Sequence, residues 1–174
     1  SYAVDNREPV RKDFIDNPQN QTPKHETLGN LEGGFRKQSD RTMLNVNVYW
    51  MNYQDQLVLT GALNDVGAAI RTNVDNSYRA GIEVDGMVRL SPKFTLNANA
   101  TFSQNKIQEF TEVLYDSGPN WEFDPPKAAS RIYTNTDIAF SPNLIAGSVV
   151  SYSPVAAAEI SLLTKYVGRQ FMDN

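Results

Sequence analysis

Two consecutive runs of alternating apolar and polar residues, joined by a short turn, constrain this chain more than any other feature. The runs are Ile82–Leu90 and Phe94–Phe102, and Ser91-Pro92-Lys93 lies between them. Successive side chains of a strand point to opposite faces, so each run has two faces. The apolar face carries Ile82, Val84, Gly86, Val88, Leu90, Phe94, Leu96, Ala98, Ala100 and Phe102, and the polar face includes Glu83, Asp85, Arg89, Asn97 and Asn99. Such a hairpin suits a soluble sheet or, with lipid on one side and a wet lumen on the other, a transmembrane barrel.

Composition excludes several classes of protein. No stretch of this 174-residue chain approaches the roughly 18 apolar residues of a membrane helix. Barrel strands are not excluded, because only about half of their residues are apolar. The net charge of −4 argues against nucleic-acid binding. The chain has no cysteine, which excludes disulfides, cysteine-ligated zinc and thiol nucleophiles.

Period-two patterns recur along the chain, whereas helical periodicity is weak. We therefore expect an all-β fold, an antiparallel up-and-down meander of about six long strands. The expected strands are His25–Lys37, Thr42–Leu57, 76–90, 94–107, Asn143–Tyr152 and Glu159–Phe171. Most of these runs reach the roughly 9–11 residues that a tilted strand needs to cross a bilayer.

The predicted connections alternate between short and long. Short turns lie near Ser39-Asp40, at 91–93 and at 153–158, and long connections are expected at 58–75 and 108–142. Every second connection of an antiparallel meander lies at the same end of the sheet. All short turns are then at one end and all long loops at the other, as in outer-membrane barrels. Residues 1–24 are expected to form another long loop. Aromatic residues near strand ends, such as Trp50 and Tyr152, would fit an interfacial girdle, or simply the high strand propensity of aromatics.

Several segments, taken in order, resemble one protein family. They are residues 7–14 (REPVRKDF), 23–28 (PKHETL), 48–57 (VYWMNYQDQL), 77–83 (SYRAGIE), 141–143 (SPN) and 165–174 (KYVGRQFMDN). These segments and their order resemble the C-terminal β-barrel region of TonB-dependent outer-membrane receptors, especially those of Bacteroidetes-type bacteria.

The resemblance implies a segment of a transmembrane barrel of about 22 strands in the bacterial outer membrane. Such a receptor imports a scarce nutrient, such as a siderophore or a glycan, and receives energy from TonB through a plug domain in its lumen. The partners implied are membrane lipid, the plug, the remaining barrel strands, TonB and the small ligand. Residues 1–174 are expected to form a partial barrel domain without the plug or the closing C-terminal strand.

Candidate contact residues follow from this picture. Trp121, Glu122 and Phe123 lie in the longest predicted loop, where aromatic rings could stack on a ligand, and Arg7 and Arg11 lie near Asp13 in the first loop. Glu83, Asp85, Arg89, Asn97 and Asn99 are expected to face the lumen, with Arg89 offsetting the two carboxylates. No catalytic motif, cofactor site or metal site is expected. His25 is the only histidine, and Ser103 with Lys106 matches S-x-x-K without its partner motifs.

Two alternatives remain open from the residues alone. The first is a soluble β-sandwich that binds carbohydrate, and the second is a passive porin. A second sheet of this chain packed on the apolar face would favour the sandwich. An open apolar face would favour a barrel.

Overall fold

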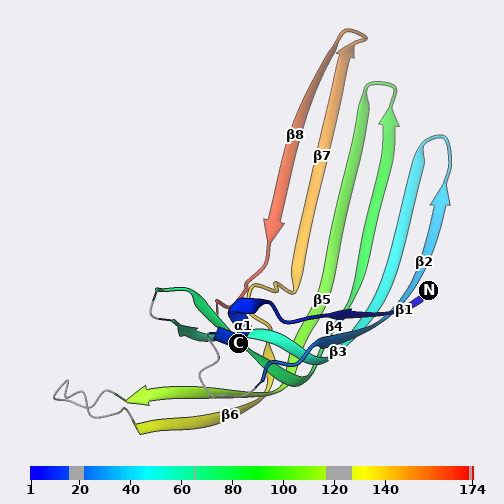
Figure 1. Ribbon diagram of the computed structural model, residues 1–174. Coiled ribbons are helices and arrows are strands. Elements are labelled where there is room, and N and C mark those ends of the chain that lie inside the picture. The colour runs from blue at the N-terminus through cyan, green and yellow to red at the C-terminus, as the bar shows by residue number, and fades with distance from the viewer. Residues whose placement is uncertain (16–21, 65, 117–126, 173) are drawn as a thin grey trace.

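The computed structural model describes residues 1–15, 22–64, 66–116, 127–172 and 174 (Figure 1). In these residues a single sheet holds eight antiparallel strands, accompanied by one short helix. The elements in chain order are β1 (Tyr2–Arg7), α1 (Arg11–Ile15), β2 (Glu26–Gln38), β3 (Thr42–Leu63), β4 (Ala69–Ser91), β5 (Phe94–Asp116), β6 (Lys127–Asp137), β7 (Leu144–Val155) and β8 (Ala158–Val167). Among the described residues, no helix is long and apolar enough to cross a membrane.

The six strands expected from the sequence are all present, as β2, β3, β4, β5, β7 and β8. Their short turns lie at one end of the sheet, where three long hairpins rise side by side (Figure 1). The two runs Ile82–Leu90 and Phe94–Phe102 pair as an antiparallel hairpin of β4 and β5, with Val84 opposite Ala100 and Asp85 opposite Asn99. We call this paired part the wall: β2, β3 up to Gln54, β4 from Asn76, β5 up to Lys106, β7 and β8.

The apolar face of the wall is bare. Leu90 is 67% exposed and Phe102 is 55% exposed, although both are large apolar side chains. The described residues form one sheet, so no second layer of this chain covers that face. This arrangement contradicts the soluble sandwich, because a sheet in water buries its apolar face against another layer.

Two stacked aromatic pairs bound this apolar face. Phe94 stacks on Tyr152 near the short turns, with ring centroids 4.4 Å apart. Trp50 stacks on Tyr78 at the other end, with centroids 5.2 Å apart. The ladder places Trp50 level with Gln104 of β5, ten residues from Phe94. Ten residues span ~33 Å along a strand and ~25 Å across a bilayer once tilted, which matches the apolar band of outer-membrane barrels.

Beyond the wall, β3, β4 and β5 bend sharply at one level (Figure 1). Asp55 and Asn135 have left-handed backbones there, with φ of 52° and 58°. The ladder between β3 and β4 skips Asp55, and the ladder between β5 and β6 skips Asn135. Asp and Asn adopt this conformation more readily than other side chains, so these two residues suit the bend.

The part past the bend has its own core, and we call it the loop layer, together with β1, which pairs with Glu26–Leu31 of β2: it consists of β1, α1 and the described residues of 55–75, 107–143 and 168–174. A cluster of buried apolar side chains holds it together, made of Val58, Val74, Ile107, Phe110 and Ile138, with Tyr133 packed against them. The predicted loops at 58–75 and 108–142 were therefore largely wrong. They contain the ends of β3, β4 and β5 and the whole of β6, because this core and the ladders order them. The expected loop at 1–24 likewise contains β1 and α1.

On the edge of β5 that faces away from β4, two different strands pair with it in succession. Residues 106–116 of β5 pair with β6, and residues 94–102 pair with β7. The intervening residues 138–143 leave the ladder, and Phe140 has a left-handed backbone with φ of 54°. The Phe140 amide donates to the Phe171 carbonyl at 2.8 Å, and the Asn174 side chain joins Ala139 to Leu59. Phe171 and Asn174 are thus hydrogen-bonded to residues 139 and 140, where the ladder is interrupted.

Candidate functional site

The polar face of the wall brings together all five residues predicted to share it. By register and alternation, Glu83, Asp85 and Arg89 of β4 lie on the same face as Asn97 and Asn99 of β5. Asn45 of β3 lies opposite Asp85, and its amide donates to both carboxylate oxygens at 2.9 and 3.2 Å. The expected offset by Arg89 is therefore replaced, for Asp85, by a neutral amide donor on the neighbouring strand. A second carboxylate, Glu32 of β2, accepts from the Asn30 amide at 2.7 Å.

A shallow hollow of about 480 Å³ lies on this face near the short turns. Its lining includes Gly147, the polar residues Asp85, Asn97, Asn99 and Lys165, and the apolar residues Ile145, Val149 and Leu163. Three of the five predicted polar-face residues therefore surround one depression. An amine, two amides and a carboxylate line it, so it offers both donors and acceptors.

A second hollow of about 380 Å³ lies on the same face, where the wall meets the loop layer. Its lining includes Glu32 and Glu83, the Tyr49 ring, Arg79 and the Phe140–Pro142 segment. Arg79 donates to the Ser141 hydroxyl at 2.9 Å, which ties that segment to β4. Aromatic rings beside carboxylates and a guanidinium suit a polar ligand with an apolar surface.

One cross-strand contact shapes this second hollow. Tyr49 pairs with Gly81, and its ring lies across the glycine: a Cβ built on Gly81 would meet the Tyr49 hydroxyl at 2.5 Å and the Phe102 carbonyl at 2.7 Å. The missing side chain is therefore what lets the ring lie flat along the wall. Tyr49 belongs to the polar face, so it is not part of an aromatic girdle. Sequence reasoning missed this pair because it needs the register of β3 on β4.

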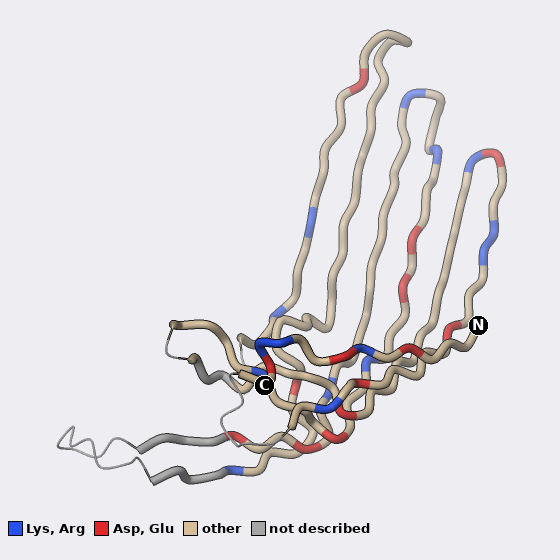
Figure 2. The backbone as a smooth tube through the Cα atoms, viewed as in Figure 1, with Lys and Arg blue, Asp and Glu red and all other residues tan. Residues whose placement is uncertain are grey.

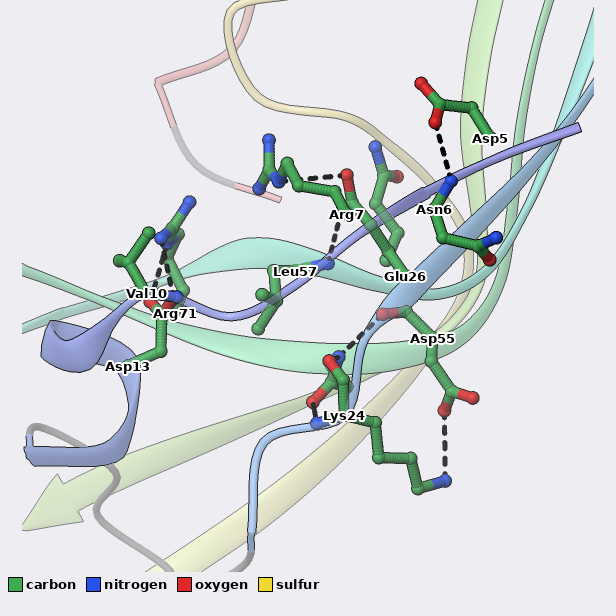
Figure 3. A network of polar contacts seen from close by, with 12 residues as sticks. Asp5, Asn6, Arg7, Val10, Asp13, Lys24, Glu26, Asp55, Leu57 and Arg71 are labelled. Carbon is green, nitrogen blue, oxygen red and sulfur yellow. Dashed lines mark hydrogen bonds and ion pairs between the residues drawn. The ribbon is translucent and has the colours of Figure 1, made fainter.

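The predicted charged residues of the first loop are engaged separately (Figure 3). Arg7 lies in β1 and pairs with Glu26 at 3.1 Å, while Glu26 also accepts from the Leu57 amide at 3.1 Å. Asp13 of α1 is buried and takes two hydrogen bonds from Arg71 of β4, at 2.8 and 2.9 Å. Arg11 is exposed at the start of α1. Arg7 and Asp13 thus fasten the loop layer together, whereas Arg11 projects from it.

Some candidates cannot be placed. Trp121, Glu122 and Phe123 lie outside the described residues. His25 is exposed immediately before β2. Within the described part of the chain, no group of three or more His, Asp or Glu side chains could hold a metal ion.

Comparison with known proteins agrees with the observed fold, a single sheet that has an exposed apolar face and all of its short turns at one end. The sequence matches the family described as "TonB dependent receptor-like, beta-barrel" over residues 10–171. The chain therefore belongs to the TonB-dependent receptors, at their β-barrel region. These are non-enzymatic transport proteins of the bacterial outer membrane.

Among solved structures, one similar chain is the copper transporter OprC. Its TM-score is 0.69 at 15% identity, and the match covers 99% of this chain and 24% of OprC. The likeness shows a shared fold, and the present chain spans about a quarter of that protein. No curated protein sequence matches.

Proposed function

We propose that this chain is part of the barrel wall of a receptor that imports a scarce nutrient, such as a siderophore or a glycan. The observation that carries the proposal is the two-faced single sheet, with one bare apolar face and one polar face that is hollowed beside the loop layer. Residues 1–174 are then a partial barrel domain, and the plug and the remaining strands belong to the rest of the receptor. The Bacteroidetes-type source expected from the resemblance remains a prediction.

In this proposal each face has a defined partner. The apolar face, bounded by the two aromatic stacks, contacts lipid. The polar face, with Glu83, Asp85, Arg89, Asn97 and Asn99, faces the lumen and the plug, through which TonB delivers energy. The short turns are periplasmic and the loop layer is extracellular, the usual orientation of these barrels.

We place the ligand at the extracellular end of the lumen. The hollow between Tyr49, Glu83 and Phe140 supports this location, because it lies where the polar wall meets the loop layer. Arg11, which projects from α1, and Trp121, Glu122 and Phe123 remain predicted contacts. Arg7 also remains a predicted contact: it pairs with Glu26, and its side chain is 55% exposed.

Site-directed spin labelling tests the two faces. Because the chain has no cysteine, the pair Ala100→Cys and Thr101→Cys can be labelled in the full receptor, once any cysteines elsewhere are removed. We expect the label at 100 to be relaxed by oxygen, which dissolves in lipid, and the label at 101 by a water-soluble nickel complex. Equal accessibility of the two sites would contradict a wall between lipid and lumen.

Energy dependence separates a receptor from a passive porin. Import through a TonB-dependent receptor should stop when the proton gradient is dissipated or when TonB is deleted. Continued solute flux in the cells that lack TonB would favour the porin.

A further inference from the structure

Three basic residues near the short turns are exposed and take part in no ion pair of the described chain. Within the described residues, four ion pairs form: Arg7 with Glu26, Lys24 with Asp55, Arg71 with Asp13 and Lys106 with Asp137. All four lie at the loop-layer end. Lys37, Arg41 and Lys93, which we call the basic rim, are exposed at the first two hairpin tips (Figure 2) and take part in none of the ion pairs of the described chain.

Arg41 and Lys93 lie at the edge of the apolar band, whereas Lys37 lies further in, level through the ladder with Ala98 of β5, four residues from Phe94. Lys37 is on the apolar face of β2, two residues after Phe35, which is 60% exposed on the same face. Lys93 precedes Phe94, whose ring stacks on Tyr152, and the Lys93 carbonyl accepts from the Ser153 amide at 2.9 Å. Arg41 is joined to β4 through its carbonyl, which accepts from the Arg89 amide at 2.8 Å. A stacked aromatic pair beside ammonium and guanidinium groups marks the headgroup level of a membrane.

The positive charge of the basic rim has no acidic ion-pair partner among the described residues of the wall. Asp40 lies next to Arg41 in the same turn, yet the two side chains form no ion pair in the described structure. The third tip carries Glu159, whose carboxylate accepts from the Ser161 hydroxyl at 3.1 Å. At this end of the sheet, exposed basic residues without an ion-pair partner in the described chain therefore lie at the tips of the β2–β3 and β4–β5 hairpins.

From this geometry we propose that the basic rim binds the phosphate of an anionic phospholipid in the periplasmic leaflet. Lys and Arg are the side chains that bind phosphate, as a point charge and as a planar fork respectively. The acyl chains of the same lipid would lie along the exposed apolar face formed by Phe35, Leu44 and Leu90. The inference rests on the proposed orientation, in which the short turns are periplasmic.

The test compares two pairs of substitutions, each removing one arginine and one lysine that are exposed. Arg41→Gln with Lys93→Gln changes the basic rim, and Arg11→Gln with Lys12→Gln changes α1 at the opposite end. The full receptor is reconstituted in phosphatidylcholine nanodiscs, and its association with spin-labelled phosphatidylglycerol is measured at low salt. Each lost charge should weaken association about fivefold, so the rim pair should lose about 25-fold, and the α1 pair should be unchanged. The wild-type preference should also shrink as salt rises.

Three outcomes would overturn the inference. These are a rim pair that keeps the wild-type association, an α1 pair that loses as much as the rim pair, and a wild-type rim that prefers lipid A to phosphatidylglycerol. Insertion is checked separately by protease protection of the wild type. A wild-type receptor that fails to insert would overturn the proposed function together with the rim, whereas correct insertion with unchanged lipid association in the rim pair would overturn the rim alone.

Discussion

The wall and the loop layer share the same strands but not the same surroundings. Phe102 and Phe110 both belong to β5, eight residues apart, yet the first is 55% exposed and the second 2% exposed. Apolar side chains of the wall are exposed on one open face, whereas those of the loop layer pack against one another. In the proposed function, the same strand is therefore stabilised by lipid before the bend and by an internal core after it.

The largest expected effect comes from opening the core of the loop layer. Phe110→Ala should destabilise the loop layer by about 3–5 kcal/mol, because a buried ring leaves a cavity. Urea denaturation of the reconstituted receptor, with hydrogen exchange to locate the loss, measures it. Phe102→Ala is the matched control and should cost less, since lipid fills the vacated space. Equal losses would show that the two regions are not stabilised differently.

A charge placed on each face of one strand should distinguish the wall's two sides. Ala100→Arg puts a guanidinium in the middle of the apolar band, at a cost of about 2–4 kcal/mol, whereas Thr101→Arg on the polar face should cost under about 1 kcal/mol. Refolding into vesicles, monitored by the shift in electrophoretic mobility of a folded barrel, compares the two. If Thr101→Arg proved the more damaging, the assignment of the faces would be reversed.

A smaller effect is expected where the wall is closely packed on its polar face. Gly81→Ala should cost about 1–3 kcal/mol, because the new methyl group meets the Phe102 carbonyl, which is backbone, and the Tyr49 hydroxyl. Gly33→Ala meets only a Val48 methyl group at 3.7 Å and should be neutral or slightly stabilising. Thermal denaturation of both variants tests this difference, and a neutral Gly81→Ala would mean that the Tyr49 ring is not seated on the glycine.

The smallest effect concerns an exposed ion pair of the loop layer. A hydrogen bond from Lys24 to Asp55, at 3.0 Å, and the charge of that carboxylate raise the pKa of Lys24. Because the pKa is higher in the folded chain, the stabilisation is fully present below the unfolded pKa of about 10.4 and is lost as the pH rises through the folded pKa.

Asp55→Asn removes this ion pair and keeps a side chain that tolerates the left-handed backbone. The small difference in unfolding midpoint between wild type and Asp55→Asn should be constant between about pH 6 and pH 8, and should shrink as the pH rises above about 10.4 and through the raised pKa of Lys24. A difference that persists unchanged at the higher pH would show that the pair does not contribute through the Lys24 charge.

The sequence predicted the wall closely and the loop layer poorly. The wall follows from local information: alternation assigns Val84 and Asp85 to opposite faces, and the short turn at 91–93 sets their pairing. The loop layer depends on contacts between distant segments, such as Val58 with Ile107 and Ile138. No local pattern indicates such a core, so the sequence predicts loops where the structure has β1, β6 and α1.

The candidate site divides in the same way. The shared face of Glu83, Asp85 and Asn97 could be predicted, because it requires only the period of a strand. The roles of Arg7 and Asp13 could not, because their partners Glu26 and Arg71 come from other strands and lie 19 and 58 residues away. The local sequence around Arg7 and Asp13 therefore does not indicate that these residues form ion pairs that hold the fold together.

The split partner of β5 has a consequence for how such receptors diversify. A one-residue slip in a strand sends every side chain to the opposite face, so insertions within the wall are heavily penalised. Since β4 and β7 pair with β5 in the wall and β6 pairs with it beyond the bend, residues 138–143 separate the two registers. The β5–β6 arm, and with it the surface that the proposed function offers to a ligand, can therefore be lengthened or replaced without shifting the register of the wall by a single residue.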